Sequence, residues 1–192
     1  AWDMTRDAEV STGDYLELVI TGCGTEPDIG AVQMALRQVR AAIDQFAAPD
    51  HRDAYGERLA DAMLALARGA EPGSDHQLAF ARAFAGSAST DAQLAIVAGL
   101  LDGSVVWDGL AVDTELRWFL LERLVAAGRA EDDAIESELA RDDTAAGRRH
   151  AAYARAARPT SVAKELAWAD IIDRTDLPNA MLEASMGGFA QP

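Results

Sequence analysis

The chain has 192 residues, 49% of them hydrophobic and 26% charged, a balance typical of a folded globular protein and too apolar for a disordered one. Its 32 acidic residues outnumber its 17 basic residues, which gives a formal net charge of −15. Such a chain is repelled by phosphate backbones and anionic lipid headgroups, so its composition disfavours a role in nucleic-acid binding or at a membrane surface.

Apolar residues spaced three and four apart predict helices along nearly the whole chain. The strongest signal places six apolar residues on one helical face: Ile29, Val32, Leu36, Val39, Ile43 and Phe46. In chain order, the predicted helices cover residues 2–9, 12–22, 28–46, 50–68, 74–86, 90–102, 113–127, 130–141, 144–157, 160–173 and 178–187. No stretch alternates apolar and polar residues for long enough to predict a β-sheet.

Prolines, glycines and serines mark the ends of these predicted helices. Five prolines stand at or just before a helix start, where a missing N–H costs nothing: Pro27, Pro49, Pro72, Pro159 and Pro178. Four glycines stand where a helix is expected to end: Gly69, Gly86, Gly103 and Gly128. Ser11 and Ser89 precede two helices and are expected to cap their first free amides.

Helices this short and one-sided cannot bury their apolar faces alone, whereas stacked antiparallel pairs can. The sequence therefore predicts an all-α fold, a curved helical array of antiparallel helix pairs of the HEAT or armadillo type, rather than a four-helix bundle. Because no disordered linker divides the chain, we expect residues 1–192 to form a single domain.

The residue clusters that catalytic centres need do not occur in the sequence. A zinc site on a helix requires two histidines one turn apart, and His51, His76 and His150 are far from one another. There is no Gly-x-Ser-x-Gly nucleophile motif and no glycine-rich phosphate loop, and Cys23 has no histidine nearby in sequence. We therefore expect no catalytic, metal-binding or cofactor-binding residue in this chain, which disfavours a small helical enzyme.

Targeting signals are also lacking in the sequence pattern. No apolar run approaches the roughly 20 residues that span a bilayer. One cysteine, Cys23, cannot form an intrachain disulfide, which fits a reducing compartment and predicts a cytoplasmic location. The chain begins at Ala1 without an initiator methionine and inside an amphipathic stretch, so we expect it to be excised from a longer protein.

The sign of the charge reverses between residues 131–143 and residues 148–158. Acids early in one helix and bases late in the next suit the helix dipoles. Alternatively, some of the bases face the concave side of the array and hold an anionic group such as a peptide carboxylate, in which case the candidate contacts are Arg148, Arg149 and His150. Acidic pairs such as Glu131 and Glu138 are expected to form a solvated face.

Several segments along the chain point together to one family. They are Ala1-Trp2-Asp3-Met4-Thr5-Arg6-Asp7, Asp14-Tyr15-Leu16-Glu17-Leu18-Val19, Ile29-Gly30-Ala31-Val32-Gln33, Pro72-Gly73-Ser74-Asp75-His76-Gln77-Leu78, Gly109-Leu110-Ala111-Val112-Asp113-Thr114-Glu115-Leu116-Arg117-Trp118, Ala154-Arg155-Ala156-Ala157-Arg158-Pro159-Thr160 and Gly188-Phe189-Ala190-Gln191-Pro192. In order and spacing they resemble the C-terminal domain of bacterial aminopeptidase N, in the branch related to the endoplasmic-reticulum aminopeptidases.

This resemblance implies a non-catalytic helical domain of a zinc metallo-aminopeptidase, which releases N-terminal amino acids from peptides. The family's zinc site, His-Glu-x-x-His, and its Gly-x-Met-x-Asn motif lie in a preceding thermolysin-like domain, and neither motif occurs here. The implied role is to enclose the active-site chamber and control peptide access, with the parent's catalytic domain and peptide substrates as partners. The alternative is a free-standing helical-repeat scaffold that binds a protein partner along its groove.

Overall fold

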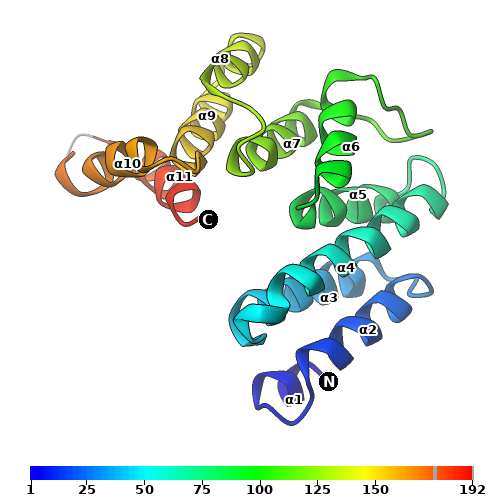
Figure 1. The fold of residues 1–192 in the computed structure, drawn as a ribbon. Helices are drawn as coiled ribbons and strands as arrows, with labels where there is room; N and C mark the ends of the chain where they lie inside the picture. Colours follow the sequence, from blue (N-terminus) through cyan, green and yellow to red (C-terminus); the bar gives the residue numbers. More distant parts are fainter. Residues whose placement is uncertain (175–176, 192) are drawn as a thin grey trace. The chain divides into compact units, whose positions relative to one another are not determined.

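The computed structural model describes residues 1–174 and 177–191, and every regular element within them is helical (Figure 1). The elements in chain order are α1 (Trp2–Arg6), α2 (Thr12–Cys23), α3 (Ile29–Ala41), the π-helical turn η1 (Ala42–Phe46), α4 (Pro49–Gly69), α5 (Asp75–Ser87), α6 (Asp91–Asp102), α7 (Thr114–Ala126), α8 (Asp132–Arg141), α9 (Ala145–Ala157), α10 (Ser161–Asp173) and α11 (Asn179–Phe189). This confirms the predicted all-α class.

Two predicted helices differ from the observed ones in their C-terminal turns. The first, predicted over residues 2–9, ends at Arg6 because Ala8 has a positive φ of 62° and the chain turns back, with the amides of Glu9 and Val10 donating to the Met4 carbonyl. The second, predicted over residues 28–46, widens into η1, where the Ala47 amide donates to the carbonyl of Ala42 five residues earlier.

The predicted helix caps are partly confirmed. Ser11 caps α2, since its hydroxyl accepts from the Asp14 amide at 3.0 Å. The prediction for Ser89 was wrong. Thr90 accepts from the Gln93 amide, and the Gln93 side chain accepts in return from the Ser89 and Thr90 amides, a reciprocal capping box.

The glycine predictions are confirmed at two of the four positions. Gly103 and Gly128 have φ values of +82° and +67° and follow α6 and α7, as a left-handed end residue should. The predictions for Gly69 and Gly86 were wrong, because α4 includes Gly69 and α5 runs on to Ser87. Each helix is followed by an alanine with extended ψ, Ala70 after α4 and Ala88 after α5, so neither helix end needs a residue in the left-handed conformation.

The described helices group into two compact units, each with consecutive helices packed against one another. The first is Ala1–Ala95 with Val106–Ala111, and the second is Ile96–Val105 with the chain from Val112 onward, so the division falls within α6. In the first unit α4 packs on α5 and α2 on α3, while in the second α9 contacts α7, α8, α10 and α11 (Figure 1). A single domain over residues 1–192 stays a prediction.

Each unit buries its own apolar side chains. The core of the first includes Val32, Val39, Leu59, Met63 and Phe84. The core of the second includes a cluster of buried residues from α7, α8 and α9: Trp118, Leu121, Val125, Ile135, Ala151 and Ala154. Among the described residues, no helix is both long and apolar enough to cross a bilayer.

Candidate functional site

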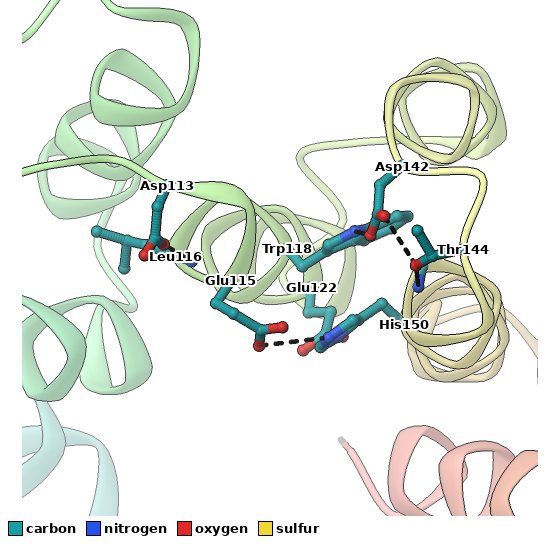
Figure 2. Close-up of polar contacts among 9 residues, drawn as sticks. Asp113, Glu115, Leu116, Trp118, Glu122, Asp142, Thr144 and His150 are labelled. Carbon is teal, nitrogen blue, oxygen red and sulfur yellow. Dashed lines mark hydrogen bonds and ion pairs between the residues drawn. The ribbon is translucent and has the colours of Figure 1, made fainter.

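Polar side chains of α7 and α9 meet beside the core of the second unit (Figure 2). Glu115, Trp118 and Glu122 are spaced three and four residues apart, so they share one face of α7. Asp113 starts this helix by accepting from the Leu116 amide at 2.9 Å. His150 reaches the same face from α9.

The imidazole of His150 is held on three sides. Its ring stacks on the Trp118 indole with centroids 5.5 Å apart and an interplanar angle of 11°. Its Nδ1 lies 2.8 Å from Glu122 Oε1, and its Nε2 lies 3.6 Å from Glu115 Oε2. Because the two ring nitrogens point to two different carboxylates, the ring orientation is fixed by both.

Glu122 is the carboxylate of this group that is most removed from solvent, with 15% of its side chain exposed. Burial raises the pKa of Glu122, the hydrogen bond and charge of His150 work against that rise, and the negative charge of Glu115 adds to it. Since burial is the largest cause, Glu122 holds its proton more readily than an exposed glutamate does.

Asp142 connects this group to α8, whose C-terminal end it forms. Its Oδ2 accepts from the Trp118 Nε1–H at 2.9 Å, and its Oδ1 accepts from the Thr144 hydroxyl at 2.8 Å. The hydrogen bonds from Thr144 and Trp118 lower the pKa of Asp142. A Cβ at Gly147 would lie 2.0 Å from the Asp142 carbonyl oxygen, so the start of α9 approaches α8 this closely only with glycine there. We call these six residues the His150 cluster: Glu115, Trp118, Glu122, Asp142, Thr144 and His150.

The reversal of charge between α8 and α9 has a direct structural explanation. Asp132 on α8 pairs with Arg158, and Glu136 on α8 pairs with Arg155 at 2.5 Å. A third pair joins Asp143 and Arg148, also at 2.5 Å. The two helices therefore carry opposite charges because they face each other, which is a different cause from the helix dipoles or an anionic ligand.

The prediction of a solvated face at Glu138 was wrong. Glu138 is 5% exposed, and its carboxylate accepts two hydrogen bonds from the Arg117 guanidinium, at 2.7 and 2.6 Å. Arg117 also donates to the Leu101 carbonyl at 3.0 Å. A bidentate partner on α7 is what makes burial of this carboxylate possible.

Comparison with known proteins decides the family. The family described as ERAP1-like C-terminal domain matches residues 1–192. The chain belongs to this family. It is 57% identical over 191 residues to a protein of Streptomyces lividans named Aminopeptidase N, a match that covers 100% of the chain and 22% of that relative. The chain thus spans about a fifth of the length of the curated relative it matches.

In this ERAP1-like C-terminal domain, the three predicted contact residues do not converge. Arg148 is engaged by Asp143, and His150 is held in the His150 cluster. Arg149 is exposed and makes no ion pair with any described residue. Consecutive residues on an α-helix point about 100° apart, so Arg148, Arg149 and His150 leave α9 in different directions, and their contact with a peptide carboxylate stays a prediction.

The described part of this ERAP1-like domain does not fit a zinc site. No group of three or more His, Cys, Asp and Glu side chains within it could hold a metal ion. In the His150 cluster the imidazole nitrogens diverge toward separate carboxylates instead of converging with them on one point. Cys23 is 4% exposed, and burial, with the charge of Glu26, raises the pKa of its thiol. That thiol is therefore a poor nucleophile.

Proposed function

We propose that this chain is the non-catalytic C-terminal domain of a zinc-dependent aminopeptidase that releases N-terminal amino acids from peptides. The observation that carries the proposal is the 57% identity to an Aminopeptidase N over the whole chain. In this proposal the parent's catalytic domain holds the zinc ion, and the helical domain encloses the active-site chamber and controls peptide access. Its partners are that catalytic domain and the peptide substrates, in the cytoplasm.

Among the predicted carboxylate contacts, Arg149 is the best placed to hold the end of a peptide. Arg148 already neutralises Asp143, and a carboxylate approaching His150 would meet Glu115, whose side chain is 63% exposed. Arg149 has neither competitor among the described residues, so its guanidinium is available for a bidentate contact with a carboxylate. Arg148 and His150 remain secondary candidates in this role.

The test is a charge reversal in the full-length protein, Arg149→Glu, assayed on matched peptides of increasing length. We expect kcat/KM for long peptides to fall by about tenfold relative to that for a dipeptide, the loss of one charge-assisted contact. Arg37→Glu is the matched control, because Arg37 is also exposed and makes no ion pair with a described residue. An unchanged ratio between long and short peptides in Arg149→Glu would reject the contact.

A second candidate function, a helical-repeat scaffold for another protein, is favoured by one surface. Four large apolar side chains of α10 are each more than half exposed: Val162, Leu166, Trp168 and Ile172. By helical spacing they form two pairs, Val162 with Leu166 and Trp168 with Ile172, and large exposed apolar side chains can serve as contacts for a protein partner. A scaffold would bind its partner without any preceding catalytic domain, so the two candidates differ in whether peptidase activity accompanies the chain.

A further inference from the structure

A hollow of about 530 Å³ opens within the first unit, between α1, the start of α2, η1 and the start of α4. It has the size of sites that hold small organic molecules. Two backbone features border it, the positive φ of Ala8 and the π-helical turn η1, which supplies Gln45 and Phe46.

The charge of the lining differs from that of the rest of the chain. The described residues that line the hollow include no aspartate or glutamate, although 32 of the 192 residues are acidic. They do include Arg6 and His51. Arg6 also touches Asp3 and Asp7, at 3.3 and 3.4 Å, and all three side chains are more than half exposed, so these contacts are weak and exchangeable.

Hydrogen-bonding groups of the lining lack partners within the described residues. Thr12 is only 8% exposed, yet its hydroxyl bonds to no described group. The Tyr55 hydroxyl also has none, and the Tyr55 ring stacks on His51 with centroids 5.7 Å apart. Neither oxygen is among the buried polar atoms without a partner, so both are open to the hollow and can bond to water or to a group that enters it.

The start of α4 adds to the positive character of this hollow. Ala47 and Ala48 line it, and no side chain caps this 21-residue helix, whose N-cap residue is Ala48. Pro49 has no N–H, the His51 amide donates to the Ala48 carbonyl at 2.9 Å, and Asp50 stands in the first turn, so what this end offers an anion is mainly the helix dipole. Val10, Phe46 and Ala47 supply an apolar wall for an uncharged body beside that anion.

We propose that this hollow binds a small organic carboxylate with a single aromatic or similar apolar body. The carboxylate lies toward Arg6, His51 and the start of α4, the hydroxyls of Thr12 and Tyr55 donate to it, and the apolar body packs against Phe46 and Val10. Since the lining offers no carboxylate to pair with an ammonium group, amines are rejected and zwitterionic amino acids bind weakly. The site is separate from the proposed aminopeptidase role and does not depend on it.

The test is titration of the ¹⁵N-labelled chain with three probes, phenylacetate, acetate and phenethylamine, followed by NMR chemical shifts. We expect phenylacetate to bind with a Kd on the order of 1 mM, acetate at least about tenfold more weakly, and phenethylamine without saturation. The shifts should map to α1, the start of α2, η1 and the start of α4.

Two variants and their matched controls locate the contact. Thr12→Val removes the unpartnered hydroxyl and keeps the shape, and Arg6→Gln removes the charge; each should weaken phenylacetate binding about tenfold. Thr21→Val, an exposed position on the same helix, and Arg37→Gln should leave it unchanged. If Thr12→Val lowers the melting temperature, the exposed Arg6→Gln alone decides the outcome. Absence of saturable shifts up to about 20 mM, equal binding of phenethylamine, or binding unaffected by Arg6→Gln would overturn the proposal.

Discussion

At the scale of single residues, Glu138 and Arg117 form a bidentate ion pair between α7 and α8, in which the carboxylate is buried. We predict that Glu138→Gln lowers the free energy of unfolding by about 2–4 kcal/mol, because it leaves the Arg117 charge without its partner in a half-buried site. Glu136→Gln is the control, since it breaks an ion pair between exposed side chains and should cost less than about 1 kcal/mol. Urea denaturation of both variants measures the difference. Equal losses would mean that burial does not decide the strength of the pair.

The pH dependence of stability offers a second test at this scale. Burial raises the pKa of Glu122 above its ordinary 4.5, so the folded state binds this proton more tightly than the unfolded state does. The contribution of Glu122 to stability is therefore present below pH 4.5 and is lost as the pH rises through the folded pKa. Glu122→Gln removes this loss, so the variant should gain stability relative to the parent chain as the pH rises above 4.5.

Asp142→Asn should change the pH dependence of folding stability in the opposite direction to Glu122→Gln. The hydrogen bonds from Thr144 and Trp118 lower the pKa of Asp142, so its contribution is present above the ordinary value of 3.8 and is lost as the pH falls through the folded pKa. The deficit of Asp142→Asn should thus be larger at neutral pH than at about pH 3. If both variants shifted the pH profile in the same direction, the assigned causes would be wrong.

At the scale of helices, α9 and α11 approach so closely that the crossing requires glycine. A Cβ at Gly188 would lie 2.1 Å from the Tyr153 carbonyl oxygen, a backbone atom that cannot move aside alone. We predict that Gly188→Ala costs about 1–3 kcal/mol of folding free energy, from overpacking. Gly56→Ala, inside α4 where an added Cβ meets nothing within 4 Å, should instead stabilise by about 0.5–1 kcal/mol through helix propensity. Thermal or urea unfolding distinguishes the signs, and a stabilised Gly188→Ala would contradict the close crossing.

Helix positions could be predicted because their causes are local. The spacing of Val32, Val39 and Ile43 and the cap at Ser11 depend on residues a few positions apart, and the structure confirms them. The π-helical widening at η1 and the turn at Ala8 could not be predicted, because they depend on contacts with the helices packed beside them and not on the local sequence pattern.

Only the α7 part of the His150 cluster could be predicted from the sequence. Glu115, Trp118 and Glu122 share a helical spacing, but 28 residues separate Glu122 from His150, and only the packing of α9 on α7 joins them. A stronger signal was available for α8 and α9. Acids spaced by four, at Asp132 and Glu136, followed by bases spaced by three, at Arg155 and Arg158, indicate two antiparallel helices joined by ion pairs.

At the scale of the whole molecule, the family is established by the match over residues 1–192, whereas the activity of the longer protein is a proposal. The exposed apolar side chains of α10 and Arg149, which makes no ion pair with a described residue, are features of the described chain that a partner domain or a peptide could engage. We propose that this chain contributes to peptide hydrolysis only when it is joined to a catalytic domain.

The most direct test measures hydrolysis of a fluorogenic aminoacyl amide, with added zinc, by this chain alone and by the longer protein that carries it. We predict hydrolysis by the longer protein only, abolished by a chelator and restored by zinc. Hydrolysis by the chain alone would contradict the claim, because it requires a catalytic centre among these 192 residues. Inactivity of both proteins would also contradict it, and would favour the helical scaffold.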